Sequence, residues 1–323
     1  MNMSTHIPKV SIGIPVYNGE NFLSEAIECV LAQTYQDFEI ILSDNGSTDA
    51  TQEICEAYTA KDARISYYRS DQNRGAAWNF NQTFELSRGD YFKWLAHDDL
   101  MAPEFLERTV AVLDQDPEVV LAYTGVSLID ENRELIEEYK DKIDSGNPDP
   151  GKRFRALLLD WSLCFEVFGL IRRQALLQTP VMGNYGHGDG VLLARLGLLG
   201  RFQDVPEYLL FSRKHKKQSM REFGYEGGGN DYHRYTVWFD TSKAGRLLFP
   251  NWRIMGEYYR SIWMVSLSLY TRLYCHIVVA RWIRHNVRNL SKDLLVNVRV
   301  VGERVRGMML VTKQAGQVEE KPG

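Results

Sequence analysis

Between residues 8 and 124, short apolar runs alternate with segments in which apolar residues recur every three or four positions. Such runs predict buried strands, and such spacing predicts helices with one apolar face. The runs lie at 10–14, 38–42, 65–69, 91–95 and 119–123, and the helical segments at 20–33, 50–59, 76–87 and 103–113. Strands that alternate with helices of this length form a mostly parallel sheet with right-handed crossovers. We therefore expect an α/β, Rossmann-like sheet in this half of the chain.

The pattern is weaker beyond Asp130. Residues 137–153 are polar and rich in Asp, Pro and Gly, which is typical of a mobile loop. Further along, the spacing of apolar residues predicts strands at 163–171, 201–204 and 207–212 and a helix at 191–199. Residues 238–311 have helical character throughout.

Three consecutive glycines, at 227–229, mark the clearest break in the chain. We expect a large domain over residues 1–223, with halves of about 8–125 and 126–223. A glycine-rich linker at 224–230 would join it to a helical, basic and aromatic region at 231–312, and the remaining residues, 313–323, would form a disordered tail.

Charge is unevenly distributed over the 323 residues. The net charge is −4, which argues against nucleic acid as the main partner. Residues 260–310, however, hold nine Lys/Arg against two Asp/Glu, a net charge of +7. Residues 311–323 are balanced, so residues 1–259 carry −11. An acidic body with a basic C-terminal region is therefore expected.

Aromatic side chains accompany the arginines of this basic region. Packing of its helices on the body is the favoured interpretation. Peripheral contact with an anionic membrane surface and a contact between copies of a homo-oligomer are the alternatives. A membrane-spanning helix is not expected, because charged or polar side chains interrupt the longest apolar stretch, 262–283, at Arg272, His276 and Arg281.

The cysteines at 29, 55, 164 and 275 are scattered and form no CxxC pair. This distribution favours a reducing compartment. The first ten residues contain no apolar stretch of the kind found in signal peptides. We therefore expect a cytoplasmic protein, with any membrane contact peripheral and on the inner face of the membrane.

The predicted strand at 91–95 leads into two adjacent carboxylates, Asp98 and Asp99. Side-by-side carboxylates repel each other, and a divalent cation relieves that repulsion. An N-cap at Asp99 for the helix that begins near Pro103 is the alternative role. Because open α/β sheets bind ligands at the carboxyl ends of their strands, the pair indicates a metal site there.

Each of the first four strands is followed by a polar cluster. Parallel strands bring these clusters to one edge of the sheet, where a tyrosine ring, carboxylates and a metal site together indicate a nucleotide pocket. The chain contains neither GxGxxG after the first strand nor GxxxxGK[ST], which excludes dinucleotide-binding and P-loop proteins. The clusters lie at 15–18, 44–47, 71–75 and 97–99.

Five separated motifs resemble glycosyltransferase family 2. They are VSIGIPVYNG at 10–19, VLAQTY at 30–35, FEIILSDNGSTD at 38–49, NRG at 73–75 and the acidic pair at 98–99. The resemblance covers about residues 8–219. It implies a GT-A fold, to which the sequence pattern adds a helical C-terminal appendage. It also implies a nucleotide-diphosphate-sugar donor, a divalent cation (Mn²⁺ or Mg²⁺) and an inverting transfer.

The same resemblance assigns roles on the donor side of the site. The family's usual Leu-Asp-x-Asp-Asp is here Leu-Ala-His-Asp-Asp, so Ala96 replaces the first acid and His97 stands beside the pair. Asp98 would contact the donor and be the principal metal ligand, with Asp99 close by. The base would be held by Pro15, Tyr17 and Asp44, with Asn18 and Glu20 nearby and Asn73 and Gly75 lining the nucleotide side.

In the second half, Asp189 corresponds to the family's general base, and Gly188 replaces the glutamate that usually precedes it. Asp189 would take the proton of the acceptor hydroxyl. An N-cap of the following helix is the alternative role, compatible with catalysis. His215, in the basic segment 213–215, would complete the metal shell or face the diphosphate, unless the segment is only a solvated turn.

The expected function is therefore that of an inverting, metal-dependent glycosyltransferase acting on a hydroxyl of a glycan or a lipid-linked saccharide, in polysaccharide or glycoconjugate assembly at the cell envelope. Ala96 and Gly188, two departures at acidic positions, support the alternative of a catalytically silent subunit that binds sugar nucleotides. A nucleotidyltransferase would need a glycine-rich, basic loop after the first strand, which residues 18–21 do not provide. Acceptor choice is expected to depend on 137–153 and 183–188.

Overall fold

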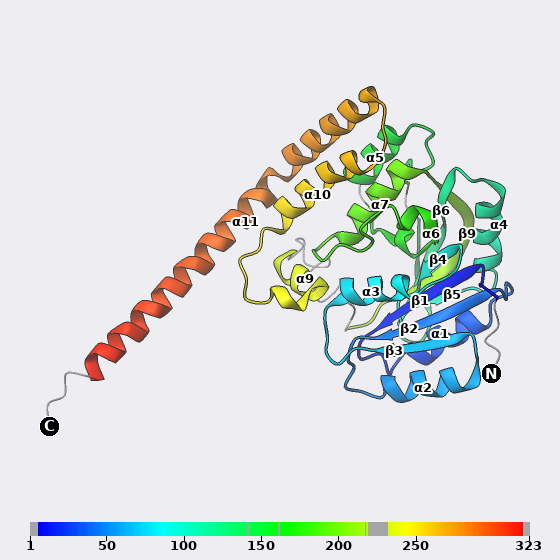
Figure 1. The fold of residues 1–323 in the computed structure, drawn as a ribbon, viewed down its shortest axis with the longest axis horizontal. Helices are drawn as coiled ribbons and strands as arrows, with labels where there is room; N and C mark the ends of the chain where they lie inside the picture. Colours follow the sequence, from blue (N-terminus) through cyan, green and yellow to red (C-terminus); the bar gives the residue numbers. More distant parts are fainter. Residues whose placement is uncertain (1–5, 141, 161, 217, 219–231, 319–323) are drawn as a thin grey trace.

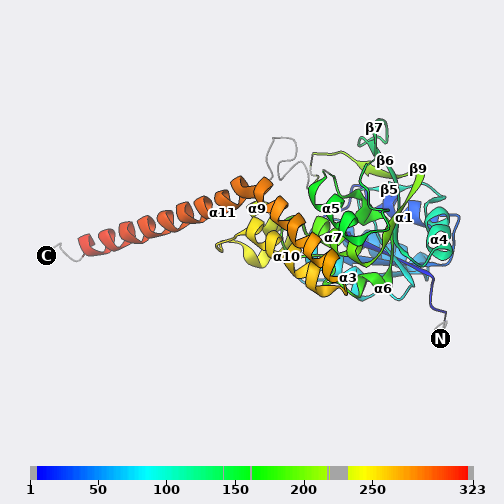
Figure 2. The ribbon, with the colours of Figure 1, turned by 90° about the horizontal axis from the view of Figure 1, so that it is seen from above.

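A computed structural model describes residues 6–140, 142–160, 162–216, 218 and 232–318 (Figure 1). A nine-stranded mixed sheet with flanking helices forms the body of this part of the chain. A group of C-terminal helices packs at one side of the body, and the last helix extends away from it (Figure 2).

The N-terminal half contains the expected parallel strands in the order β3-β2-β1-β4. Every residue of β1 and β2 is buried, because helices cover both faces of this part of the sheet. The strands are β1 (Val10–Val16), β2 (Phe38–Asp44), β3 (Ile65–Arg69) and β4 (Tyr91–Trp94). The helices are α1 (Leu23–Leu31), α2 (Thr51–Lys61), α3 (Ala76–Glu85) and α4 (Phe105–Gln115).

Successive residues of the strands serve two separate apolar clusters. Tyr91 packs with α1 and α4 in one cluster, and its neighbour Phe92 packs with α3 and α7 (Gly188–Leu199) in the other. Since side chains alternate across a strand, the two clusters lie on opposite faces of the sheet. This burial on both faces fixes the register that carries the polar clusters to a common edge.

The second half extends the sheet with strands of both directions. Its path continues β4-β8-β6-β9-β5, with β7 paired to β6. β8 is antiparallel to both β4 and β6, whereas β6 and β9 are parallel. The strands are β5 (Leu100–Met101), β6 (Val119–Ile129), β7 (Leu135–Tyr139), β8 (Leu170–Arg172) and β9 (Arg201–Arg213).

Three expectations for this half are wrong in detail. The strand expected at 163–171 is a 3-10 turn, η1 (Phe165–Phe168), followed by the short β8, because Cys164 takes a left-handed conformation. The strands expected at 201–204 and 207–212 form one strand, β9. Pro206 is accommodated where the register with β6 shifts, so its missing N–H costs no ladder hydrogen bond.

The segment expected to be a loop, 137–153, instead carries the end of β7 and the start of a helix. α5 (Pro150–Leu159) begins there, with proline in its first turn. The Asp149 carboxylate caps this helix by accepting from the backbone N–H groups of Gly151, at 2.7 Å, and Lys152, at 3.1 Å.

The C-terminal region packs as helices on the body, as expected. Residues of α5 and α7 join those of α10 (Pro250–Met264) and α11 (Leu269–Val318) in a third apolar cluster. The buried Arg195 of α7 forms an ion pair with Glu257 of α10. The remaining helical segments are α6 (Arg173–Leu176), α9 (Tyr232–Phe239) and η3 (Thr241–Lys243).

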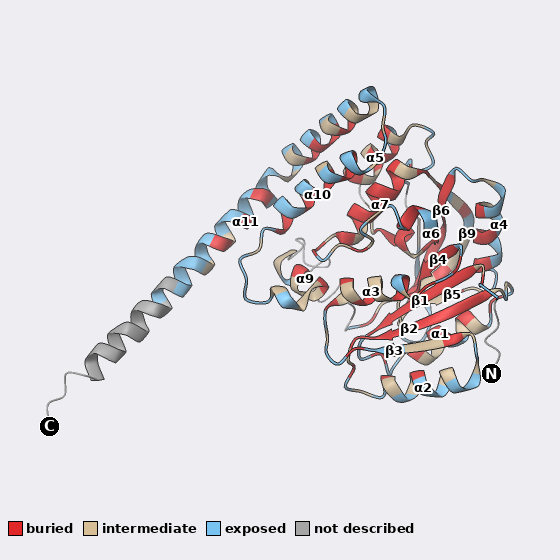
Figure 3. Cartoon of the chain, viewed as in Figure 1, coloured by how far each residue is buried: buried red, intermediate tan, exposed pale blue. Residues whose placement is uncertain are grey.

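The C-terminal part of α11 projects from the body (Figure 1), and residues 294–304, whose exposure is described, are mostly exposed (Figure 3). Because the helix continues to Val318, it extends into the segment 313–323 that was expected to be disordered. The expected linker, 224–230, lies outside the described residues. In the part of the chain that the structure describes, no helix is both long and apolar enough to cross a membrane.

Candidate active site

A cavity of about 670 Å³ opens at the carboxyl ends of β1 and β4. The loops after these strands form one wall, and η1, the start of α7 and helix α9 form the other. Eight of the expected site residues lie on this cavity: Pro15, Tyr17, Asn18, Asn73, Asp98, Asp99, Asp189 and His215. The second and third strand ends also contribute, through Asn45 and Asn73.

Asp98 and His215 come together from distant parts of the sequence. The Asp98 Oδ2 atom lies 2.8 Å from Nε2 of His215, which follows β9. The His215 ring packs against the Phe22 ring, with centroids 5.1 Å apart. Burial disfavours the charged carboxylate, but His97 and the hydrogen bond with His215 outweigh it, so the pKa of Asp98 lies below its ordinary value.

Asp99 lies deeper than Asp98. Its Oδ1 accepts a hydrogen bond from the backbone N–H of Arg213 at 2.9 Å. Burial and the adjacent charge of Asp98 raise the pKa of Asp99 to about 8. Two carboxylates in this environment compete for a single negative charge, and a bound divalent cation would let both ionise.

The Asp98 carboxylate and the His215 imidazole lie together on the cavity, and Asp99 is next to Asp98 in the chain. Carboxylates with one imidazole are ligands that suit Mn²⁺ or Mg²⁺. Among the described residues, however, the ligand atoms of these three side chains do not all come within 4.8 Å of one another, so side-chain movement would be needed for all three to hold a cation. Ala96 offers no ligand atom at the position of the family's usual first acid.

Arg213 anchors the segment that carries His215. Its side chain is fully buried, donates to Glu25 at 2.9 Å and to the Asp98 carbonyl at 3.0 Å, and stacks on Phe22. The basic segment is therefore not a solvated turn at this residue. Nothing local in the sequence distinguishes this buried arginine from an exposed one.

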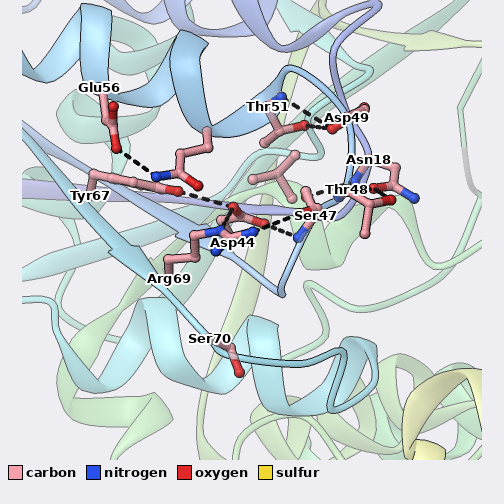
Figure 4. A network of polar contacts seen from close by, with 12 residues as sticks. Asn18, Asp44, Ser47, Thr48, Asp49, Thr51, Glu56, Tyr67, Arg69 and Ser70 are labelled. Atoms are coloured by element: carbon pink, nitrogen blue, oxygen red, sulfur yellow. Dashed lines mark hydrogen bonds and ion pairs between the residues drawn. The ribbon is translucent and has the colours of Figure 1, made fainter.

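Asp44 does not line the cavity, contrary to the expected contact with the base. Its carboxylate is fully buried and accepts from Ser47 N at 2.8 Å, Tyr67 Oη at 3.0 Å and Arg69 Nε at 3.0 Å (Figure 4). Both carboxylate oxygens of Asp44 therefore accept hydrogen bonds from within the protein. Asp44 therefore shapes the turn after β2 from behind the pocket wall.

Asn45, the next residue, occupies the cavity wall instead. Its side-chain amide donates to Asn73 Oδ1 at 3.0 Å and to the Gly75 carbonyl at 3.2 Å, and its carbonyl oxygen accepts from Arg74 N at 3.0 Å. Asn45 therefore fastens the loop after β3 to the turn after β2. Strand alternation could have indicated that only one of residues 44 and 45 faces the pocket.

Gly75 lies behind this wall rather than on the cavity. It begins α3 with φ +92°, and a Cβ atom there would approach the Phe239 carbonyl to 2.5 Å. A side chain at this position would be both strained and excluded by the backbone of α9. Gly75 therefore allows the chain to pass close to α9, and it does not line the nucleotide side of the cavity as expected.

Asn18 and Glu20 join the loops after β1 and β2. The Asn18 Oδ1 accepts from Thr48 N at 2.9 Å, and the Glu20 carboxylate accepts from Ala50 N at 3.2 Å. Glu20 does not line the cavity, whereas Asn18 reaches its edge in a left-handed conformation, φ 52°. The exposed ring of Tyr17, 42% accessible, remains the larger surface for a ligand.

Asp189 lines the same cavity as Asp98 and lies in the first turn of α7. Its Oδ1 accepts from the backbone N–H of Gly190 at 2.8 Å. Gly188 lies against the backbone of Gly183, where a Cβ would come within 2.5 Å of the carbonyl oxygen. A glutamate at 188 would therefore clash, which accounts for the departure from the usual pair.

Histidine 187 was not expected in the site. It precedes α7 with φ 68°, and its Nδ1 lies 3.9 Å from the Asp189 carboxylate. Burial lowers the pKa of His187, so the ring is neutral at pH 7. The aromatic residues Tyr232, Tyr235 and Trp238 of α9 line the same wall and were also missed, since only the tertiary packing brings α9 to the cavity.

Comparison with known proteins agrees with this geometry. The family model "Glycosyl transferase family 2" matches residues 11–178. An uncharacterised glycosyltransferase of Rickettsia typhi is 36% identical over 183 residues, 56% of this chain and 54% of the relative. The glycosyltransferase GlyG of Streptococcus pneumoniae is 35% identical over 113 residues, 35% of this chain and 38% of that protein. The chain thus spans about half, or less, of these relatives' lengths.

Two solved structures share the fold. TarS of Staphylococcus aureus, solved with UDP-GlcNAc, is 15% identical, with a TM-score of 0.58 over 86% of this chain and 72% of that one. A mannosyltransferase of Pyrobaculum calidifontis, solved with GDP-Man and Mn²⁺, is 16% identical, with a TM-score of 0.51 over 98% and 82%. At these identities the likeness concerns the fold, a GT-A sheet with flanking helices. Since the family model matches more than half of the chain, the protein belongs to glycosyltransferase family 2.

Proposed function

We propose that this enzyme transfers a sugar from a nucleotide diphosphate to a hydroxyl with inversion, and that it requires a divalent cation. The observation that carries the proposal is that one cavity is lined both by the hydrogen-bonded Asp98 and His215 and by Asp189. Inverting displacement needs the leaving group and the base on opposite sides of the anomeric carbon, and this cavity offers candidate residues for both.

On the donor side, Asp98, Asp99 and His215 would hold Mn²⁺ or Mg²⁺. When bound, the cation neutralises charge on the leaving diphosphate. Tyr17 offers a ring face to the base, and Asn73, whose Oδ1 is held by Asn45, offers the N–H groups of its side-chain amide. Asp44 acts only by fixing the turn that presents Asn45.

On the acceptor side, Asp189 would take the proton of the attacking hydroxyl. Its hydrogen bond with Gly190 N leaves the second carboxylate oxygen available for this. The aromatic side chains of α9 provide flat apolar surfaces beside it, suited to the C–H faces of a sugar. A glycan or a lipid-linked saccharide is the class of acceptor that fits, and polysaccharide or glycoconjugate assembly is the process.

The relatives support the donor class. TarS is described with UDP-GlcNAc and the mannosyltransferase with GDP-Man and Mn²⁺. By analogy, this enzyme would take a nucleotide-diphosphate sugar together with a divalent cation. The analogy does not select the base or the sugar, since the two relatives differ in both.

Thermal unfolding of the purified protein with UDP, GDP, dTDP and CDP, each with and without Mn²⁺, tests the proposal. A ligand at about 100 times its dissociation constant adds roughly 2.7 kcal/mol of stability, which raises the midpoint by several degrees. We expect one nucleotide to stabilise the protein, and only with the metal. Stabilisation by none of them would contradict the proposed donor site. Binding without turnover of any sugar nucleotide would favour a silent subunit.

We also propose that α11 makes peripheral contact with an anionic membrane surface on the cytoplasmic side. Leu295 and Val298 are each 70% exposed on the projecting part of this helix, and the basic Lys292 and Arg299 are exposed beside them. Apolar side chains among basic ones on an exposed helix are typical of interfacial binding. A contact between two copies of α11 is the competing explanation.

A further inference from the structure

Cys164, His187 and Asp189 lie together on the acceptor wall of the cavity. They come from the start of η1 and the start of α7. One potential ligand atom from each, a thiol sulfur, an imidazole nitrogen and a carboxylate oxygen, lies within 4.8 Å of the other two. Among the described residues, this is the group of cysteine, histidine and acidic side chains that meets the spacing of a metal site.

From this geometry we propose a second cation site, formed by Cys164, His187 and Asp189 and suited to a thiophilic divalent ion such as Zn²⁺. Zinc bonds to these donors are about 2.0–2.3 Å long, so ligand atoms around a tetrahedral ion lie roughly 3.3–3.8 Å apart. His187 Nδ1 and Asp189 Oδ1 are 3.9 Å apart. Small side-chain rotations would therefore complete the site.

The surroundings of His187 favour metal binding through Nδ1. Its other ring nitrogen, Nε2, lies 3.2 Å from the hydroxyl of the fully buried Tyr258. Histidine ligands commonly donate their second ring N–H to such a partner, which fixes the ring and its tautomer. The ring also lies directly over Gly190, where a Cβ would come within 2.2 Å of it, so only glycine leaves this position open.

The site differs in chemistry from the carboxylate–histidine cluster at the donor end. A thiolate and an imidazole select zinc or cobalt, whereas the oxygen-rich set of Asp98, Asp99 and His215 suits Mn²⁺ or Mg²⁺. Three protein ligands leave a fourth position open toward the cavity, since all three residues line it. The two sites should therefore bind different ions at the same time.

Occupation of the second site would regulate transfer. The ion would use the carboxylate of Asp189 and make it unable to take the acceptor proton. Zn²⁺ is therefore expected to inhibit the enzyme reversibly. This consequence rests on the proposed function, whereas ion binding itself does not.

The test is a titration of the metal-free, reduced protein with Co²⁺ in the absence of nucleotide. A cobalt–thiolate bond gives a charge-transfer absorption in the near ultraviolet that oxygen and nitrogen ligands do not give. We expect this band in the natural protein, its loss in Cys164→Ser, and its displacement by Zn²⁺. Tyr258→Phe should keep the band and weaken Co²⁺ binding by about tenfold or more.

Two control variants separate the sites and the cysteines. Asp98→Ala removes a ligand of the donor-end cluster and should keep the band. Cys29→Ser changes a cysteine on α1, outside the group, and should also keep it. Circular dichroism shows whether each variant folds. Absence of the band from the natural protein, or its persistence in folded Cys164→Ser, would refute the site.

Activity is then measured separately. If the proposed function holds, Zn²⁺ inhibits sugar transfer by the natural protein in the presence of excess Mn²⁺, and a chelator restores it. Cys164→Ser should need at least about tenfold more Zn²⁺ for the same inhibition. A cobalt band without sugar transfer would leave the site standing and contradict the proposed function. Sugar transfer without a cobalt band would support the proposed function and refute the second cation site.

Discussion

Lys93 lies inside the sheet, on β4, as a fully buried amine. Its Nζ donates to the carbonyl of Phe168 and lies 4.1 Å from the centre of the Phe105 ring. Burial lowers the pKa of Lys93 from 10.5 to about 7, because a charged ammonium is poorly solvated there. A single residue of β4 therefore makes stability depend on pH.

The sign of this dependence can be derived. Between about pH 7 and 10.5 the unfolded chain binds a proton at Lys93 that the folded chain does not, so the contribution to the free energy of unfolding rises with pH in this window. Compared with Lys93→Met, the natural protein should gain up to a few kcal/mol between pH 7 and 10. Urea unfolding of both proteins at each pH measures the difference. A difference independent of pH would contradict the lowered pKa.

Asp189 and Asp98 have separable roles under the proposed function. Asp189→Asn should lower the transfer rate by about 10²–10⁴-fold, since the amide cannot accept a proton, and should leave Mn²⁺-dependent nucleotide binding intact. Asp98→Ala should abolish both. Transfer assays and calorimetric nucleotide titrations distinguish the two variants, and Asp160→Asn, at the exposed C-cap residue of α5, is the control. A near-natural rate for Asp189→Asn would remove it as the base.

At the scale of the element, the start of α10 is stabilised by another helix. Phe249, its N-cap residue, offers no side-chain cap. The buried Asp293 of α11 accepts instead, from Asn251 N at 2.8 Å and from the Asn251 side-chain amide at 2.8 Å. A carboxylate at a helix N-terminus is favoured by the unpaired N–H groups and by the helix dipole. This contact fixes the angle between α10 and α11.

Asp293→Ala should lower the free energy of unfolding by about 1–3 kcal/mol, because it leaves buried N–H groups without an acceptor. Asp293→Asn, which keeps one acceptor oxygen, should lower it by less. Lys292→Ala, at the exposed neighbouring position, should change it little. Chemical unfolding of the full-length variants provides the comparison, and equal stabilities of the alanine variants at 292 and 293 would show that the cap contributes nothing.

At the scale of the whole molecule, an acidic body carries a basic helix that extends beyond it (Figure 2). The apolar cluster of α5, α7, α10 and α11 attaches the first part of this helix next to the acceptor wall of the cavity. The projecting part would hold the catalytic cavity close to a surface that α11 contacts. Such proximity would favour acceptors attached to a membrane.

The membrane proposal predicts binding to vesicles that contain anionic lipid and little binding to neutral ones. Leu295→Glu combined with Val298→Glu should abolish co-sedimentation, because both side chains would otherwise enter the interface. Leu135→Glu introduces the same charge at an exposed leucine of β7, away from α11, and should leave co-sedimentation unchanged. Unchanged sedimentation of the double variant would reject the contact. A doubled mass in light scattering that the double variant loses would favour two copies of α11 instead.

Much of the N-terminal half could be predicted from local periodicity. The five strands predicted between residues 8 and 124 occur as β1 to β4 and β6, and the four predicted helices as α1 to α4, because local patterning specifies which of their faces are buried. The two-residue strand β5 was not predicted. The polar clusters after the strands could be predicted to meet for the same reason, since parallel strands share a carboxyl edge. Asp98 and Asp99 therefore lie on the cavity, whereas Asp189, which also lines it, was expected there only from the resemblance to the family.

The remaining features depend on contacts between residues far apart in the chain, which no local pattern specifies. Asp44 lies away from the pocket, and its carboxylate accepts hydrogen bonds from Tyr67 and Arg69 of the neighbouring strand. Asn45 lines the pocket instead. Pro206 is tolerated within β9 only because the register with β6 shifts around it.

The sequence by itself thus determined the family, the parallel half of the sheet and the carboxylates on the cavity, since these follow from short-range patterning. Only the tertiary structure decided which neighbouring side chain faces a ligand. It alone brought Cys164 and His187 to Asp189, whereas the meeting of His215 with Asp98 was expected from the family resemblance. The physical reason is that side-chain direction and pairing are set by packing across elements, after the elements themselves have formed.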